Sequence, residues 1–359
     1  MRHGRPIVSR IALSTLALVA TLANPHSAGA QARAGGIAAP ADTDLSRLQK
    51  RIAALAAAFD GDVGVAAIHV ESGRGVAASG DRPFFLASVY KLPIAVALLR
   101  RVDAGTLALS DSVRLDPWDY RIGRATLAPN RPGGAGMYTL ARLLDAMLTD
   151  SDNTASDALL ALAGGPRAVT DTLAALGMEG IRVDRSEGET LFEFYGLPDS
   201  IPAVERTPAR VSALVQASSS EANADAVARF AADPKDAASA LALAEFLDRL
   251  WRGELLSATA TRLVFERLRN SAIETRIVAG VPPGAPVWHK TGTYGPAAIH
   301  DTGIVELPDG THLIVVVLAR QPRRDTGAAE RAIVAITHAA YEFWSVPTLS
   351  RPAGADSEE

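Results

Sequence analysis

Cysteine is absent from the sequence, and this absence excludes more chemistry than any other feature of the composition. Without a thiol the chain forms no disulfide, no thiolate metal site, no cysteine nucleophile and no lipidated amino-terminal cysteine. The seven histidines are scattered, and none belongs to an H-x-H or HExxH set. A metal-dependent hydrolase is therefore disfavoured, and we expect no metal and no cofactor.

The sequence also lacks a large excess of positive or negative charge, because its formal net charge is only -4 at pH 7. The sequence offers no basic stripe for nucleic acid and no polybasic patch for a membrane surface, so we expect a monomer that binds small molecules. Lysine itself is scarce and occurs only as Lys50, Lys91, Lys235 and Lys290. A buried lysine, unlike an arginine, can lose its proton near neutral pH, so Lys91 within an apolar run is a candidate functional residue.

The one apolar stretch with the flanking residues of a targeting signal lies at the amino terminus. Three arginines precede an apolar stretch at 11–23 that is short for a membrane span, and small residues follow at 28–30. This pattern predicts a secretory signal peptide over 1–30, cleaved near Ala30, and a periplasmic or secreted protein with a flexible mature start at 31–41. A signal anchor that stays in the membrane is the alternative. We expect no transmembrane helix in the mature protein.

The remaining chain has the periodicity of an α+β protein. Apolar residues recur at helical spacing over 42–59, and the alternation in 62–80 breaks at a Ser-Gly pair, as in a β-hairpin. Three strand candidates follow one another in 285–320, and 327–344 closes as a helix. Strands at both ends with helices between them predict one antiparallel sheet assembled from both termini, with a helical lobe inserted.

These elements predict one domain over 42–346 and a carboxy-terminal tail. The domain consists of an α/β part at 42–87 and 276–346 and a helical lobe at 88–275. Residues 217–239 are small and polar, so we expect them to form a surface insertion in the lobe. The tail is 347–359.

Ser88 lies three residues before Lys91, which places the two side chains on the same face of a helix. Because an apolar site disfavours the charged amine, a neutral Lys91 can take the proton of Ser88 and make the hydroxyl a nucleophile. The pattern alone is weak, since a lysine that reaches from a helix to solvent has the same spacing.

Two further stretches contain related chemistry. SDN at 151–153 precedes an apolar helical run, although Ser, Asp and Asn are also the residues favoured at a helix amino-terminal cap. KTG at 290–292 lies in a predicted strand, where a lysine before a turn glycine is the ordinary alternative. The occurrence of all three stretches in this order is much harder to explain by chance.

The three motifs together resemble the penicillin-recognising serine hydrolases, and most closely the class A β-lactamases. The separation of 63 residues between Ser88 and Ser151 fits this family, and the 139 residues from Ser151 to Lys290 are more than we expect for it. The resemblance covers about residues 42–346. It implies an α/β sandwich with an all-helical lobe, the β-lactamase/transpeptidase-like fold.

The resemblance also implies roles for individual residues. Ser88 would attack the β-lactam carbonyl, Lys91 would accept or help to place a proton, and Ser151 would pass a proton to the leaving nitrogen. The oxyanion would be stabilised by the backbone N–H groups of Ser88 and Thr293. The substrate-binding residues would be Asn153 at the side-chain amide and Lys290, Thr291, Gly292, Thr293 and Arg276 around the carboxylate, although Arg276 can also be an ordinary surface arginine.

A class A enzyme further needs a glutamate to activate the water that hydrolyses the acyl-enzyme. The segment 182–194 offers Glu187, Glu189 and Glu193. Glu187 matches best, because it completes an Asp-Arg-x-Glu pattern in which Arg185 would help to hold the loop. A solvated loop glutamate is the alternative.

The sequence departs from the family at Leu191, where an asparagine usually shares the hydrolytic water, and the loop before Thr207 is longer than usual. This departure predicts slow deacylation. It also leaves two alternatives to a β-lactamase: a D-alanyl peptidase or esterase of the penicillin-binding family, and a penicillin-binding sensor that is acylated without turnover.

Overall fold

The computed structural model describes residues 42–127, 134–218, 225, 228–230, 232–295, 297–320 and 326–346. The predicted signal peptide at 1–30, the mature start at 31–41 and the tail at 347–359 lie outside the described residues. Within the described part, no helix has both the length and the apolar character needed to cross a membrane.

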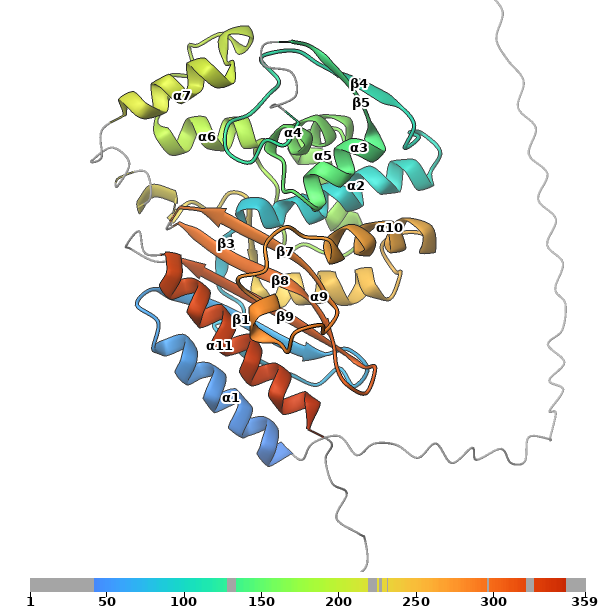
Figure 1. Ribbon diagram of the computed structural model, residues 1–359, viewed down its shortest axis with the longest axis vertical. Helices are drawn as coiled ribbons and strands as arrows, with labels where there is room; N and C mark the ends of the chain where they lie inside the picture. The colour runs from blue at the N-terminus through green and yellow to red at the C-terminus, as the bar shows by residue number, and fades with distance from the viewer. Residues whose placement is uncertain are drawn as a thin grey trace, which may run out of the picture. The chain divides into compact units, whose positions relative to one another are not determined.

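A five-stranded antiparallel sheet forms the centre of the fold, with the strand order β2-β1-β9-β8-β7 (Figure 1). The strands are β1 Asp62–His69, β2 Gly75–Ala78, β7 Val287–Tyr294, β8 Ala298–Glu306 and β9 His312–Arg320. β1 pairs with β9 from Asp62 opposite Arg320 to His69 opposite Leu313. The two ends of the domain therefore build one sheet, which confirms the prediction from the sequence.

The two faces of the sheet are covered by different helices, and β9 is apolar and buried from Leu313 to Ala319, as expected for a strand covered on both faces. Val315 and Val317 face a cluster that includes helices α1 Asp42–Ala57 and α11 Thr326–Ser345, which lie side by side (Figure 1). Ile314 and Val316 point the other way.

The opposite face of the sheet packs on α9 Ala240–Trp251. Phe246 and Leu247 of this helix belong to the same cluster as the β9 side chains on that face. α9 belongs to the helical lobe predicted over 88–275, so this lobe also supplies the cover for the second face of the sheet. A sheet with two apolar faces needs cover on both, and only the inserted helices remain to supply the second layer.

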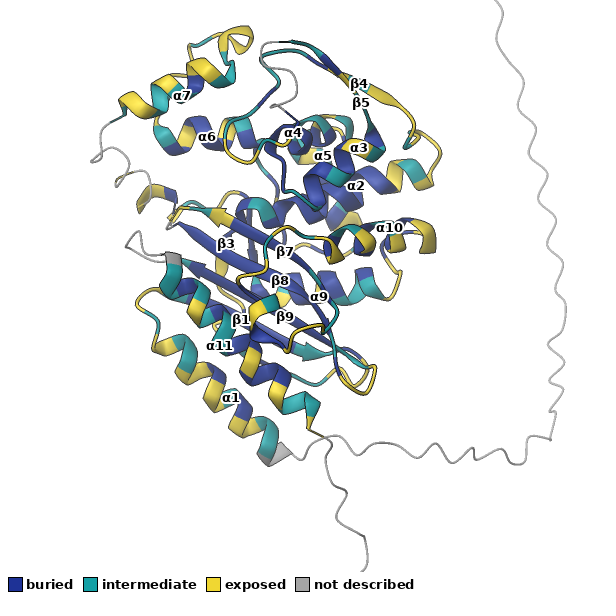
Figure 2. Cartoon of the chain, viewed as in Figure 1, coloured by how far each residue is buried: buried dark blue, intermediate teal, exposed yellow. Residues whose placement is uncertain are grey.

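The other helices form the lobe above the sheet edge. They are α2 Lys91–Asp103, α3 Leu140–Leu148, α4 Asn153–Leu162, α5 Gly165–Ala175, α6 Glu187–Tyr195, α7 Pro208–Ala217 and α10 Ala258–Arg269, with the short 3₁₀ turns η1 Ala87–Tyr90, η2 Ala203–Glu205 and η3 Val278–Gly280 elsewhere in the chain. In Figure 2 the buried residues gather along the sheet and α2, whereas the outer sides of α1, α7 and α10 are exposed.

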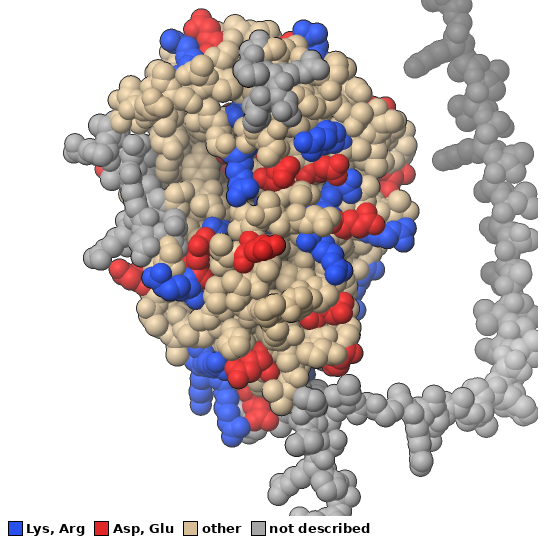
Figure 3. All heavy atoms as spheres, in the orientation of Figure 1, with Lys and Arg blue, Asp and Glu red and all other residues tan. Residues whose placement is uncertain are grey.

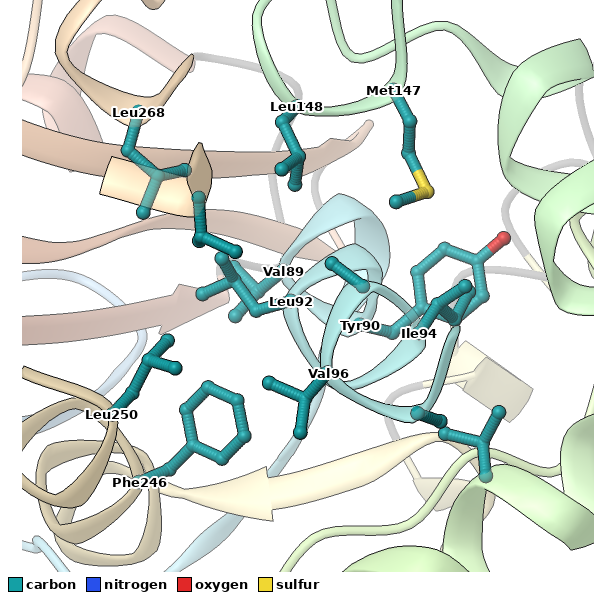
Figure 4. Packing of buried hydrophobic residues seen from close by; sticks show 14 of the residues in the cluster. Val89, Tyr90, Leu92, Ile94, Val96, Met147, Leu148, Phe246, Leu250 and Leu268 are labelled. Atoms are coloured by element: carbon teal, nitrogen blue, oxygen red, sulfur yellow. The ribbon is translucent and has the colours of Figure 1, made fainter. Parts of the chain in front are cut away.

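α2 is the central helix of the lobe, since every residue of its first nine, Lys91 to Leu99, is buried. Figure 4 shows its side chains between Met147 and Leu148 of α3 on one side and Phe246 of α9 on another. A helix enclosed on several sides cannot shift easily, because protein interiors are close-packed. The residues at its start are thus held rigidly.

Two small antiparallel pairs complete the fold: β3 Pro83–Phe85 with β6 Ala237–Ser239, and β4 Ser112–Leu115 with β5 Gly136–Thr139. β6 and the nearby Phe230, only 3% exposed, fall within the predicted surface insertion at 217–239. The described end of that segment is therefore part of the core, which corrects the prediction. A single phenylalanine among small polar residues gives no periodic signal that would have revealed this.

Charged side chains of both signs are interspersed on the face shown in Figure 3. Many form ion pairs across neighbouring elements, such as Arg51 of α1 with Glu342 of α11 at 2.8 Å. Exposed pairs of this kind contribute little to stability, typically less than about 1 kcal/mol each.

Candidate active site

A cleft of about 1050 Å³ is lined by residues of η1, the start of α4, α6 and the edge strand β7. It brings together most of the residues that the sequence analysis singled out, namely Ser88, Ser151, Asn153, Glu187, Arg276, Thr291 and Thr293. Lys91 and Lys290 are buried and reach this cleft through hydrogen bonds to Ser151.

Ser88 lies in η1 directly after Ala87, whose φ of 45° is in the left-handed region that residues with a Cβ seldom adopt. Strain of this kind costs about 1–3 kcal/mol and persists mainly at functional positions. β7 lies tightly against the same turn, because a Cβ on Gly292 would come within 2.8 Å of the carbonyl oxygen of Leu86. The glycine of KTG is required for this close approach.

Lys91 is fully buried at the start of α2, and all its hydrogen bonds go to uncharged oxygens. Its Nζ donates to the backbone oxygen of Ser151 at 2.7 Å, to Asn153 Oδ1 at 2.8 Å and to Ser151 Oγ at 3.3 Å. Burial lowers the pKa of Lys91 to about 8, although the negative charge of Glu187 opposes the shift. The amine therefore loses its proton within reach of neutral pH.

Ser151 lies between the two buried lysines. Lys290 Nζ donates to Ser151 Oγ at 2.9 Å and to the backbone oxygen of Thr291, also at 2.9 Å. Burial lowers the pKa of Lys290 well below its ordinary range, and the nearby charge of Lys91 lowers it further. Ser151 itself has a φ of 60°, in the same left-handed region as Ala87, the residue before Ser88.

Asn153 and Asp152 show that SDN is both a helix cap and part of the cleft. Asp152 is the N-cap of α4 and accepts a hydrogen bond from the backbone N–H of Ala155 at 2.8 Å. Asn153 Nδ2 donates to the backbone oxygen of Ile122 at 3.1 Å while its Oδ1 accepts from Lys91. The amide is thereby held in one orientation.

Glu187 begins α6 and is only 6% exposed. Burial raises its pKa to about 7; the charge of Lys91 lowers it, and that of Asp157 raises it. Asp157 accepts the backbone N–H groups of Glu187 at 2.7 Å and Gly188 at 3.0 Å, so it also holds the first turn of α6. A carboxyl group with a pKa near 7 is suited to general base catalysis at neutral pH.

The other two candidate glutamates have structural partners instead. Glu189 completes a capping box with Ser186, whose N–H and Oγ both donate to it at 2.8 Å. Glu193 accepts hydrogen bonds from Arg185 and from Lys235. Only Glu187 of the three lines the cleft.

Arg185 is 3% exposed and joins α6 to the segment before β6. It donates to Asp236 at 2.6 Å and to Asp233 at 2.8 Å in addition to Glu193, and its guanidinium carbon lies 4.9 Å from the centre of the Phe230 ring. This geometry supports the predicted part of Arg185 in holding the loop.

Arg276 is not an ordinary surface residue, because it is 3% exposed. Its guanidinium donates to the backbone oxygens of Gly292 at 3.1 Å and His300 at 2.7 Å, to Thr293 Oγ1 at 2.8 Å and to Glu330 at 3.2 Å. These contacts fix Arg276 beside β7, with its positive charge next to the KTG strand.

Two acidic residues were missed by the sequence analysis. Asp157 lies four residues after Asn153, one helical turn along the same face of α4, so its spacing could have pointed to it. Glu330 pairs with Arg276 from α11, and no sequence pattern connects these two residues.

The fold and this arrangement of groups define a class of protein, the class A penicillin-recognising serine hydrolases. Comparison with known proteins supports the same assignment. A β-lactamase of Streptomyces fradiae is 31% identical over 314 residues, which are 87% of this chain and 90% of the relative. β-Lactamase CTX-M-8 of Citrobacter amalonaticus is 28% identical over 341 residues, 93% of this chain and 98% of the relative.

Among solved structures, an ancestral class A β-lactamase (GNCA) has a TM-score of 0.67 at 27% identity, covering 82% of this chain and 99% of that one. The model of the β-lactamase enzyme family matches residues 47–344. The chain belongs to this family, and it is a serine hydrolase of the β-lactamase type.

Proposed function

We propose that the protein hydrolyses the amide bond of β-lactams through an acyl-enzyme on Ser88, with Lys91 and Glu187 as general bases. In the first half-reaction Ser88 Oγ attacks the carbonyl carbon and loses its proton to a neutral Lys91 or to the Glu187 carboxylate. The C–N bond then breaks, Ser151 Oγ–H protonates the leaving nitrogen, and the proton taken from Ser88 returns to Ser151 Oγ through Lys91 Nζ, which lies 3.3 Å from that oxygen.

In the second half-reaction the Glu187 carboxylate takes a proton from a water molecule that attacks the Ser88 ester. The ester C–O bond breaks, and Ser88 Oγ is protonated again. Lys290, Thr291, Thr293 and Arg276 supply the positive and polar groups for the substrate carboxylate, and Asn153 supplies an amide for the acyl side chain.

One observation carries this proposal: Lys91 and Glu187 are buried in one site with pKa values of about 8 and about 7. Burial moves the pKa values of both groups toward neutrality, so each group can take up or release a proton near pH 7. Acid–base catalysis at neutral pH requires groups of this kind.

The decisive test is the Ser88→Ala variant. It should lose turnover of a chromogenic cephalosporin by about 10⁴-fold or more, and it should show no covalent adduct in mass spectra taken seconds and minutes after mixing with benzylpenicillin. The far-UV spectrum should not change, because the substitution removes one partly exposed oxygen. Undiminished labelling of this variant would refute the role of Ser88.

The peptidase and sensor alternatives predict different results for the unaltered protein. Release of D-alanine from a D-alanyl-D-alanine peptide without turnover of the cephalosporin would favour the peptidase. A permanent stoichiometric adduct with neither activity would favour the sensor.

We also propose that the protein is exported and cleaved near Ala30. The support is the pattern of positive, apolar and small residues over 1–30. The amino-terminal sequence of the exported protein tests this proposal.

A further inference from the structure

A buried histidine and aspartate form a pair behind β7, on the face of the sheet away from the catalytic cleft. Lys290 points toward the cleft, so the preceding residue His289 points to the other face. Val287 belongs to the apolar cluster on that face, as the alternation of side chains along β7 requires. On β8, Ile299 belongs to the same cluster, so Asp301 points the same way. The strand itself therefore separates this pair from a substrate in the cleft.

Hydrogen bonds hold Asp301 in one position, although its side chain is fully buried. Its Oδ2 accepts the backbone N–H of Ile277 at 3.0 Å, and His289 Nδ1 lies 2.9 Å from Oδ1 and 3.0 Å from Oδ2. When Nδ1 carries the proton, the imidazole donates to the carboxylate and favours its ionised form. A buried carboxylate keeps its charge only with donors of this kind. Asp301 is thus equipped to hold a negative charge inside the protein.

The pair connects the two segments that carry proposed carboxylate-binding groups. His289 directly precedes Lys290 on β7, and Ile277 directly follows Arg276. Asp301 hydrogen-bonds to both neighbours, so one buried carboxylate ties the strand of Lys290 to the segment of Arg276. A change at Asp301 would act on both cations at once.

The charge of Asp301 matters because several cations surround Lys290. Burial lowers the pKa of Lys290, and so do the charges of Lys91, Arg124 and Arg276. Asp301 is the carboxylate that opposes this shift most. A protonated amine is required to attract a carboxylate, so the charge of Asp301 favours the form of Lys290 that binds.

Other titratable groups also lie in this region. They are Asp152 at the start of α4, the cleft residues Glu187, Glu274 and Glu330, and His300 of β8. Burial lowers the pKa of His300 to about 4, so its ring is neutral near pH 7. An Asp301→Asn substitution replaces none of these groups and therefore isolates the charge of Asp301.

We propose that Asp301, held by His289, is a positioning residue for the substrate carboxylate. It touches no substrate and acts through Lys290 and Arg276 from the far side of the strand. The inference rests on the proposed function, in which these two cations bind the carboxylate. The protein should favour β-lactams with a free carboxylate over their esters, and it should lose this preference without the charge of Asp301.

The test compares benzylpenicillin with its methyl ester, which lacks the free carboxylate and keeps the β-lactam ring. The measured quantity is the second-order rate constant for acylation of Ser88, from mass spectra at early times, so the comparison does not depend on turnover. Asp301→Asn should lower the ratio of the two rate constants by about 5–10-fold at pH 8, because one unit in the pKa of Lys290 changes its charged fraction by up to about tenfold. The fall of this ratio with rising pH should begin about one pH unit lower than in the parent.

Two variants of His289 test the inference even if Asp301→Asn fails to fold. His289→Asn keeps an N–H donor for Asp301 and should retain the ratio within about 2-fold. His289→Leu removes the donor and leaves Asp301 with less support for its charge, so the ratio should fall at least about 3-fold. Asp236→Asn is the matched control for replacing a buried aspartate, because Asp236 is 2% exposed and pairs with Arg185. This control should change both rate constants alike.

An equal loss for both substrates in Asp301→Asn, as in the Asp236→Asn control, would mean that the pair is only structural. The same conclusion follows if His289→Leu and His289→Asn give equal ratios. Failure of the proposed function has a different signature, because the parent protein then forms no adduct on Ser88 with benzylpenicillin.

Discussion

Two regions near the catalytic cleft contain buried basic residues but give them different partners: the floor, which we define as Lys91 and Lys290, and the wall, which we define as Arg185 with the carboxylates that hold it against α6. On the floor, the hydrogen bonds that Lys91 and Lys290 donate to other described residues all go to uncharged oxygens. In the wall, Arg185 contacts three carboxylates, those of Glu193, Asp233 and Asp236. The two lysines thus lack the carboxylate contacts that surround Arg185.

This difference separates proton transfer from anchoring. Burial without a carboxylate in contact lowers the pKa of Lys91 to about 8. Burial also acts to lower the pKa of Arg185, but Asp236 and the other carboxylates outweigh it and hold the pKa above its ordinary value. The floor can therefore exchange protons near neutral pH, whereas the wall keeps a permanent charge that holds α6 in place.

The largest effect should come from Glu187→Gln, which removes the base proposed to serve deacylation. Because general base catalysis contributes about 10²–10⁴-fold, we expect deacylation to slow by about 10³-fold and the acyl-enzyme to accumulate almost completely. Some accumulation is expected even in the parent protein, since Leu191 lines the cleft and offers no hydrogen bond to the hydrolytic water. Mass spectrometry during turnover of a good substrate measures both.

Glu189→Gln and Glu193→Gln are the matched controls for this experiment. Glu189 caps α6 and Glu193 belongs to the Arg185 cluster, so neither should trap the acyl-enzyme. Trapping by Glu189→Gln with normal turnover of Glu187→Gln would show that the hydrolytic base has been assigned to the wrong residue.

The next largest effect should come from exchanging the cation on the floor. Lys91→Arg keeps a positive charge but supplies no neutral amine, so acylation should slow by at least about 10²-fold. The rate of adduct formation under single-turnover conditions measures it. If the variant is acylated at the parent rate, Lys91 is only a structural charge. The lowered pKa of the floor lysine would then play no part in catalysis.

The converse exchange in the wall should affect stability rather than chemistry. Arg185→Lys keeps the charge but cannot contact three carboxylates with one planar group, so we expect a loss of about 2–3 kcal/mol in the free energy of unfolding. Denaturant unfolding measures it, with Arg51→Lys at an exposed pair as the control. An unchanged unfolding midpoint would mean that the Arg185 cluster does not anchor α6.

The contrast between the two regions also explains what the sequence could predict. The sheet, its assembly from both termini and the groups of the floor follow from short local patterns, such as SVYK at 88–91 and KTG at 290–292. The wall does not, because Arg185 meets Asp233 and Asp236 from about 50 residues away in sequence, through segments without periodicity. Glu330 was missed because it meets Arg276 from 54 residues away, and Phe230 because a single phenylalanine gives no periodic signal. Long-range pairs of this kind become visible only when the chain is folded.

The smallest effect concerns Glu187, the buried carboxyl group at the start of α6 that lines the same cleft. Burial raises the pKa of Glu187 from an ordinary 4.5 to about 7, so the folded state binds this proton more tightly than the unfolded state does. The corresponding stability is fully present below pH 4.5 and is lost as the pH rises through 7.

Glutamine has no charge to bury, and Lys91 loses a favourable neighbour in the variant. Glu187→Gln should therefore exceed the parent in unfolding free energy by about 1–2 kcal/mol at pH 8 and match it at pH 4. Urea unfolding at the two pH values tests this, with Ser88→Ala as a control whose difference from the parent should not depend on pH. If the difference in unfolding free energy between Glu187→Gln and the parent is the same at both pH values, burial of the Glu187 charge does not destabilise the folded protein.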